Sequence, residues 1–274
     1  MTWHVTSDLE EFEAAAGDFL RADPVRNTVL LTVVASLKTS GVAAYGDTPP
    51  YFGWYADSEV RAAFLRTPPR RALVSDAPED AVEQLVEVLD GVRGLSGPDG
   101  SVRTFAHAWH AATGRLSKVA SNRHLYSLIE LTPPRELAPG FPRAAVEADR
   151  DLLAEWFAAF GTDVGEPIGD PMRAVERCLA NGELLLWEVD DVPVAMAGFT
   201  RPIEGVRRVT PVYTPAALRG RGYAAAVVTE ISWLGMSAGH HVILFTDMAN
   251  ATSNALYQRL GYRAIGRWSE LDLA

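Results

Sequence analysis

Apolar residues recur at helical spacing at the start of the second half of the chain. In residues 144–161 one face collects Leu152, Leu153, Trp156, Phe157 and Phe160. A second helical pattern covers residues 169–182, with Pro171 near its start and Gly182 at its end. The pattern therefore predicts two consecutive helices.

The segments that follow have the shorter periods and β-branched runs typical of strands. Residues 183–191 and 192–202 flank the turn pair Asp190-Asp191, which predicts an antiparallel hairpin. Further elements are expected as a strand (207–214), a helix (222–239), a strand (240–248), a helix (250–261) and a strand (262–273). This α, α, β, β, β, α, β, α, β order predicts a mixed α/β sheet with helices on both faces.

The first half of the chain gives a weaker version of the same order. A strand at 3–6 precedes helical stretches over 8–39, and strand candidates follow at 51–57, 59–67 and 71–76. A helix (79–91), a short segment (94–98), a helix (102–114) and a strand pair (116–122 and 124–131) complete it. We interpret the two halves as a duplication, although no residue-level repeat is visible.

A proline-rich segment separates the two halves. Residues 131–143 contain four prolines and a glycine, and proline at this density interrupts helices and sheets. We therefore expect two domains, 1–138 and 139–274.

Composition narrows the function classes. The 274 residues carry a formal charge of −10 and no Lys/Arg tract, so the sequence favours cationic small molecules over nucleic acid. No segment has the uninterrupted apolar length of a membrane helix, and no secretory leader is visible, so we expect a cytoplasmic protein. The single cysteine, Cys178, lies in a helical pattern and is interpreted as a buried thiol, and the six histidines predict no metal site.

One stretch, VYTPAALRGRGYAAAVVTEI (residues 212–231), joins a strand to a helix through an arginine- and glycine-containing turn. The start of a helix carries unpaired N–H groups and partial positive charge. Gly220 and Gly222 keep side chains away from those groups, while Arg219 and Arg221 add charge, so the turn predicts an anion site. The alternative is a solvated basic turn. Neither a Walker loop nor a dinucleotide fingerprint fits these residues.

With its pattern Arg219-x-x-Gly222-x-Ala224 after a strand, the segment resembles the pyrophosphate loop of the GNAT superfamily of acyl-CoA-dependent N-acetyltransferases. A second match about 30 residues on adds to the resemblance: Asn250, Ser253, Tyr257, Gly261 and Tyr262. The alternative makes Asn250 a helix cap, Tyr257 a core aromatic residue and Gly261 a helix stop.

The resemblance implies a mostly antiparallel GNAT-like sheet and acetyl-CoA as the cofactor. It further implies that the backbone of Val212, Tyr213 and Thr214 binds the pantetheine arm, that Asn250 hydrogen-bonds the cofactor, and that Tyr257 faces the sulfur. Because the departing thiolate needs a proton that a tyrosine hydroxyl can supply, we interpret Tyr257 as the acid. The pyrophosphate would lie on Arg219, Gly220, Arg221, Gly222, Tyr223 and Ala224. Residues 75–81 of the first half are acidic and lack glycine, so a GNAT-like first half has lost its anion site.

The base that deprotonates the amine is left open between Glu188, Glu204 and water. By resemblance, the segment between the first two helices binds the acceptor, and there Asp163, Glu166 and Asp170 are either ligands for a cationic amine or a solvated loop.

The sequence thus favours acetyl transfer from acetyl-CoA to a primary amine of a small molecule. The alternatives are a protein or peptide N-acetyltransferase and a non-catalytic acyl-CoA-binding regulatory module.

Overall fold

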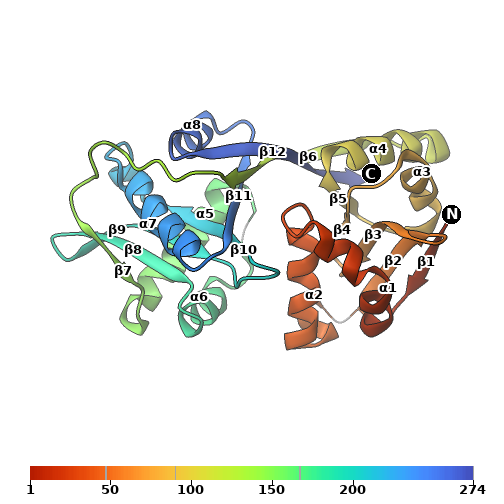
Figure 1. Ribbon diagram of the computed structural model, residues 1–274, viewed down its shortest axis with the longest axis horizontal. Coiled ribbons are helices and arrows are strands. Elements are labelled where there is room, and N and C mark those ends of the chain that lie inside the picture. The colour runs from red at the N-terminus through yellow and green to blue at the C-terminus, as the bar shows by residue number, and fades with distance from the viewer. Residues whose placement is uncertain (47, 90, 167, 274) are drawn as a thin grey trace. The chain divides into compact units, whose positions relative to one another are not determined.

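The computed structural model describes residues 1–46, 48–89, 91–166 and 168–273 (Figure 1). The chain forms two compact units: unit 1 comprises Met1–Leu125 with Ile265–Ala274, and unit 2 comprises Tyr126–Ala264. This division differs from the boundary expected between 138 and 139. The end of the chain belongs to unit 1 because the last strand completes the sheet of that unit.

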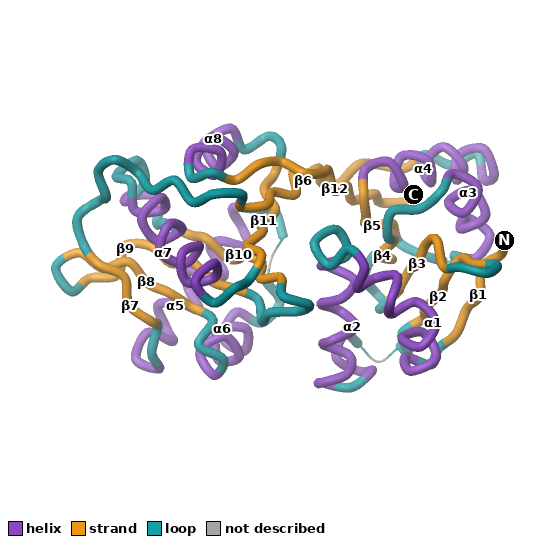
Figure 2. The backbone as a smooth tube through the Cα atoms, in the orientation of Figure 1, coloured by secondary structure: helices purple, strands orange, loops and turns teal. Residues whose placement is uncertain are grey.

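The same order of elements occurs twice along the chain (Figure 2). The first set is β1 (Thr2–Thr6), α1 (Leu9–Ala22), α2 (Thr28–Ser40), β2 (Tyr51–Ala56), β3 (Val60–Arg66), β4 (Ala72–Val74), α3 (Glu79–Val88), β5 (Gly94–Pro98), α4 (Asp99–Thr113) and β6 (Ser117–Leu128). The second set is β7 (Phe141–Ala144), α5 (Arg150–Asp163), α6 (Pro171–Ala180), β8 (Leu184–Val189), β9 (Val192–Phe199), β10 (Val206–Tyr213), α7 (Tyr223–Ser237), β11 (His241–Asp247), α8 (Ala251–Arg259) and β12 (Tyr262–Leu273). The expected mixed α/β class is confirmed, and the repeated order agrees with a duplication.

Two local predictions are corrected. The strand pair expected at 116–122 and 124–131 is one strand, β6, whose chain stays extended through Arg123. The proline-rich segment does not exclude sheet to its end, because Phe141–Ala144 pairs with β8 and Pro142 lies opposite Trp187. Strand β7 is an edge strand, where a residue without an N–H group is tolerated.

In unit 2 the strands lie in the order β6, β11, β10, β9, β8, β7. The hairpin of β8 and β9 is antiparallel, as expected, and turns at Asp190 and Asp191, which adopt φ values of 50° and 62°. Helix α7 covers one face of the sheet, where Val227 and Ile231 pack on strand residues. Helices α5 and α6 cover the other face (Figure 1).

In unit 1 the order is β1, β2, β3, β4, β5, β12. Strands β4 and β5 are parallel, and the residues Trp268–Asp272 of β12 pair antiparallel with Gly94–Pro98. Leu271 is buried with Phe64 and Leu85 in the core beneath α3 and α4. The end of the chain is therefore part of the hydrophobic core of unit 1. Of the described helices, none is long and apolar enough to cross a membrane.

Candidate active site

The centre of the unit 2 sheet opens between β10 and β11. These strands pair in parallel over Val206–Arg208 and His241–Ile243, and the described register ends there. On its other edge β10 continues beside β9, with Val212 opposite Ala197 after an irregularity in register. Over its second half, β10 has a described strand partner on one side, β9. The backbone N–H and C=O groups on its other side are therefore available to hydrogen-bond another extended chain.

Beyond β10, a short loop with a 3-10 turn at Ala216–Leu218 leads into α7. Gly220 and Gly222 have φ values of +78° and +84°, a region that favours glycine. A Cβ at Gly220 would meet nothing within 4 Å, whereas one at Gly222 would lie 3.5 Å from the Cβ of Ala138. Backbone conformation, more than crowding, requires glycine here.

Gly222 is the N-cap of α7 and has no side chain to accept from the first helical amides. The N–H groups of Tyr223, Ala224 and Ala225 point out of the helix start, where no intrahelical acceptor exists. With the positive end of the helix dipole, these amides have the chemistry that an anion needs, and an anion site here stays a prediction. Its residues are those expected for the pyrophosphate.

Arg219 lies across the end of β10. Its Nε donates to the carbonyl oxygen of Thr214 at 3.0 Å, and its guanidinium lies 5.9 Å from the ring centre of Tyr213. Its Nη2 donates to Asp163 at the end of α5. Asp163, considered a ligand for a cationic amine, is therefore already paired with an arginine. Arg221 donates from Nη2 to the carbonyl oxygen of Ala217 at 3.4 Å.

The hydroxyl of Thr214 is a buried polar group next to this arginine. Its Oγ1 has no hydrogen-bond partner among the described residues. A buried hydroxyl without a partner is unfavourable by about 1–3 kcal/mol. The end of β10 thus has an unused polar atom where the sequence expects the cofactor.

Helix α8 contributes the second group of candidate residues. The side chain of its N-cap, Asn250, accepts from the Ser253 amide at 2.9 Å. Gly261 has a φ of +98°, and a Cβ there would collide with the carbonyl oxygen of Glu130. The helix-cap and helix-stop interpretations of these two residues are confirmed, and a cofactor contact of Asn250 stays a prediction.

Tyr257 is 8% exposed and lies in an aromatic cluster. Its ring centre is 6.5 Å from that of Tyr126 and 5.8 Å from that of Tyr262. Burial raises the pKa of Tyr257 to about 12. Its hydroxyl donates to no described residue, so it holds a proton at neutral pH that no internal acceptor uses.

A buried network behind Tyr257 was not predicted. Tyr126, which is fully buried, donates to Asn254 at 3.1 Å and accepts from Gln258 at 2.9 Å. Asn254 in turn donates to the carbonyl oxygens of Asp247 and Asn250, both at 2.8 Å. Tyr126 is remote in sequence from α8, so no local pattern links them.

The two candidate bases lie apart from this arrangement. Glu188 is 6% exposed and forms an ion pair of 2.7 Å with Arg143. Glu204 is exposed in the turn before β10. At about 3.3 Å per residue, the start of β10 is about 23 Å from Tyr213. The structure does not bring either carboxylate to Tyr257 through a described contact.

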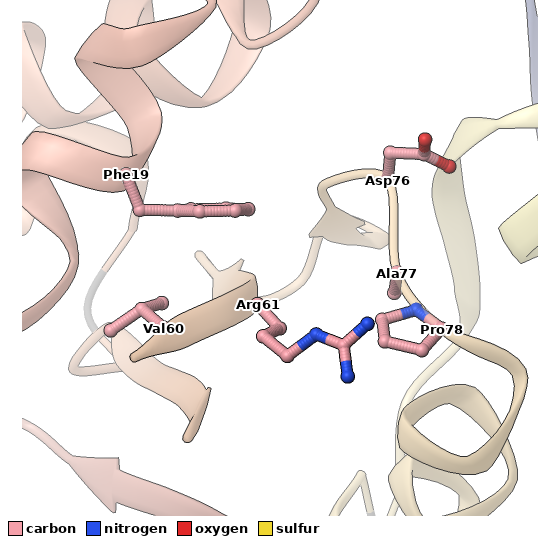
Figure 3. A pocket seen from close by; sticks show the side chains of 6 residues that line it. All are labelled: Phe19, Val60, Arg61, Asp76, Ala77 and Pro78. Carbon is pink, nitrogen blue, oxygen red and sulfur yellow. The ribbon is translucent and has the colours of Figure 1, made fainter. Parts of the chain in front are cut away.

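Unit 1 has a hollow of about 470 Å³ at the loop that corresponds, by element order, to the loop before α7 (Figure 3). Its lining residues are Phe19, Val60, Arg61, Asp76, Ala77 and Pro78. Figure 3 shows the Arg61 guanidinium extending toward Pro78. Helix α3 begins here with Glu79 and Asp80 in its first turn. These carboxylates neutralise the partial positive charge of the helix start. The start of α3 also lacks the glycines that precede α7.

No group of three or more His, Cys, Asp or Glu side chains with metal-site geometry occurs in the described ranges. Cys178 is buried, and burial raises its pKa to about 11. The burial of Cys178 confirms its interpretation as a buried thiol.

Comparisons with known proteins agree with this geometry. Residues 150–262 match the model of the acetyltransferase (GNAT) family. No curated protein matches the chain. Among solved structures, the chain is similar to a GNAT-family acetyltransferase from Colwellia psychrerythraea, with 11% identity, 100% of both chains covered and a TM-score of 0.62.

Two further structures have the same fold. One is a GCN5-related N-acetyltransferase from Sphaerobacter thermophilus, with 15% identity, 99% of this chain and 95% of that chain covered, and a TM-score of 0.64. The other is a GCN5-related N-acetyltransferase from Kribbella flavida, with 16% identity, 89% and 95% coverage and a TM-score of 0.57. At these identities the likeness shows the fold alone, and it extends over both units.

Proposed function

Residues 150–262 carry an acetyltransferase domain of the GNAT family, and from this premise we propose that the protein transfers an acetyl group from acetyl-CoA to a primary amine of a small molecule. The observation that carries the proposal is the start of α7. There a left-handed Gly222 without a capping side chain leaves the first amides of α7 without an acceptor. A short loop connects it to β10, whose pairing with β11 is described only over Val206–Arg208.

The residues present fit a diphosphate linked to an extended arm. The amides of Tyr223 and Ala224 would donate to the diphosphate, with Arg219 and Arg221 supplying positive charge. The backbone of Val212, Tyr213 and Thr214 would hydrogen-bond the pantetheine amides as a neighbouring strand does. The buried Thr214 hydroxyl, which lacks a described partner, gives that arm a further polar contact.

Acetyl-CoA supplies an activated thioester. A backbone N–H of β10 near Val212 would donate to the thioester carbonyl oxygen, which becomes negative during attack. The preceding residue, Pro211, has no N–H group and could not take this role. Tyr257 would then give its hydroxyl proton to the sulfur as the C–S bond breaks, and the surplus proton that the attacking nitrogen loses on becoming an amide would restore the tyrosine, directly or through water. The pKa raised to about 12 keeps this proton on Tyr257 until negative charge develops nearby.

The acceptor amine must lose a proton before it attacks. Its pKa near 10 makes the neutral form at pH 7 unfavourable by about 4 kcal/mol. Glu188 is held by Arg143 and Glu204 lies at the far end of β10, so we propose that water carries this proton to solvent. Roles for Glu188 and Glu204 as bases remain predictions.

The test combines binding and turnover. Calorimetry with acetyl-CoA should show one site in unit 2, and a panel of small primary amines should release free thiol at a rate proportional to enzyme. Binding without thiol release from any amine, peptide amino terminus or lysine would instead support a regulatory module. Release with peptides alone would support a protein acetyltransferase. Absence of heat at millimolar acetyl-CoA would exclude all three.

A further inference from the structure

Asp163 and Arg219 connect the end of α5 to the loop before α7. Their ion pair is formed by side chains that are 46% and 51% exposed, respectively. Arg219 is also bonded through Nε to the Thr214 carbonyl oxygen at 3.0 Å. The arginine therefore touches the end of β10, while Asp163 holds it from the side of α5.

The position of Asp163 makes a cationic partner favourable. It is the last residue of α5, where the partial negative charge of the helix end repels a carboxylate. Arg219 is its ion-pair partner among the described residues. If Arg219 moved away, a negative side chain would remain at a negative helix end, in a protein whose formal charge is −10. Such a position attracts another cation.

The proposed function gives Arg219 a competing partner. A diphosphate carries more negative charge than one carboxylate and accepts from a guanidinium through two oxygens at once. The pair of Arg219 with Asp163 is about half exposed and thus weakly held. A diphosphate on the α7 amides would therefore draw Arg219 away from Asp163.

We propose that Asp163 selects acceptors that carry a second cationic group besides the reacting amine, and that binding of the coenzyme makes Asp163 available by removing Arg219 from it. This inference rests on the proposed function and names its substrate class, a diamine. One nitrogen takes the acetyl group, and the other, still protonated, pairs with Asp163.

The exchange can be measured without turnover. Calorimetry would compare binding of 1,6-diaminohexane and hexylamine to the protein alone and to the protein saturated with CoA, which lacks an acetyl group. We expect CoA to tighten diamine binding about two- to five-fold, the range of an exposed ion pair. Diamine should tighten CoA binding by the same factor, because such coupling is reciprocal. Hexylamine should show no coupling.

The variant Asp163→Asn removes the carboxylate from this exchange. We expect it to bind CoA about two- to five-fold more tightly than wild type, because nothing competes for Arg219, and to lose the coupling with diamine. The matched control is Asp151→Asn, which removes the same charge near the other end of α5, about 18 Å away. It should leave CoA affinity and the coupling unchanged.

The outcomes separate the two proposals. If wild type binds CoA but Asp163→Asn has the same CoA affinity, or keeps the diamine coupling, the inference is overturned while the proposed function stands. A diamine that fails to bind the CoA-saturated protein overturns it as well. If wild type binds no CoA, the proposed function fails and the inference falls with it.

Discussion

The hydroxyl of Tyr126 donates to the side-chain oxygen of Asn254 at 3.1 Å, and both residues are buried. This bond fastens β6 to the helix that carries Tyr257. Tyr126 also accepts from Gln258 at 2.9 Å. Removing the hydroxyl therefore leaves the buried side-chain oxygen of Asn254 without this donor, whereas the exposed Gln258 can turn to water.

We predict that Tyr126→Phe lowers the free energy of unfolding by about 1–3 kcal/mol, the penalty of one unsatisfied buried polar group. It should also lower kcat, because α8 loses an anchor. Denaturant titration and thiol-release kinetics check both effects. Tyr55→Phe is the control: Tyr55 in unit 1 is equally buried and bonded to Asp80 and Gln84. An equal fall in kcat for both variants would contradict a positioning role.

A β-branched residue at Gly222 should damage the anion site. We predict that Gly222→Val reduces acetyl-CoA affinity at least ten-fold and costs about 1–2 kcal/mol of stability, because its φ of +84° suits glycine alone. The control is Gly239→Val, which has a φ of +79° and open space at the other end of α7. It should show the same loss of stability with unchanged affinity in calorimetry. Equal affinities in the two variants would remove the anion site from the mechanism.

Tyr257→Phe should lower kcat on the order of 100-fold, the range of a lost proton donor, with acetyl-CoA affinity unchanged. Tyr262→Phe serves as the control, because its hydroxyl bonds to Ser232 at 2.7 Å, within the core. We expect that variant to lose stability but not kcat. Unchanged turnover of Tyr257→Phe with every acceptor would exclude Tyr257 as the acid.

The raised pKa of Tyr257 has a consequence for stability at high pH. The unfolded side chain loses its proton near pH 10 and the folded one near pH 12, so the folded state binds more protons between these values. Stability must then fall as pH rises through this window, by at most about 3 kcal/mol from this group. Tyr257→Phe should show a smaller fall in urea titrations at pH 10 to 12.

Arg143 joins two buried carboxylates, donating to Asp149 at 2.6 Å and to Glu188 at 2.7 Å. We predict that Arg143→Met lowers the free energy of unfolding by about 3–5 kcal/mol at pH 7, because two buried charges lose their partner. Arg150→Met, whose ion pairs with Glu147 and Asp151 are exposed, should cost less than about 1 kcal/mol.

The contact between Arg143 and Asp149 makes the free energy of unfolding depend on pH in the acid range. The Arg143 guanidinium lowers the pKa of Asp149, so its stabilisation is present above the unfolded value near 3.9 and is lost as pH falls through the lower folded value. Arg143→Met should lose this acid-dependent part. A parallel pH dependence in wild type and variant would contradict the assignment.

Cys178 should react slowly with thiol reagents in the native protein. A pKa raised to about 11 by burial leaves about 1 in 10,000 thiols ionised at pH 7. We expect full labelling only in denaturant, followed by absorbance of the released chromophore. Fast native labelling with retained fold would show that the thiol is accessible.

Sequence periodicity predicted the elements well where apolar patterns were long, as in α7 and the β8–β9 hairpin. Local rules also identified the cap at Asn250 and the glycine turn before α7, because these depend on a few neighbouring residues. They failed for the extent of β6 and for the start of β7, where tertiary pairing decides whether an extended chain becomes a strand.

Contacts between residues distant in sequence could not be predicted. Three such contacts depend on how strands and helices pack. They are the hydrogen bond of Tyr126 to Asn254, the ion pair of Asp163 with Arg219 and the ion pair of Glu188 with Arg143. These contacts show that Asp163 and Glu188, which the sequence suggested as a ligand and a base, each have an arginine as an ion-pair partner.

Because unit 1 contains the last strand of the chain, it cannot be completed until the end of synthesis. The ribosome adds residues in order, so residues 1–125 emerge long before Trp268–Asp272, the partner of β5. Until then the edge of β5 and the core around Phe64 lack Leu271. Unit 1 therefore matures last although it is translated first, and a fragment cut at residue 138 would stay permanently at that immature stage.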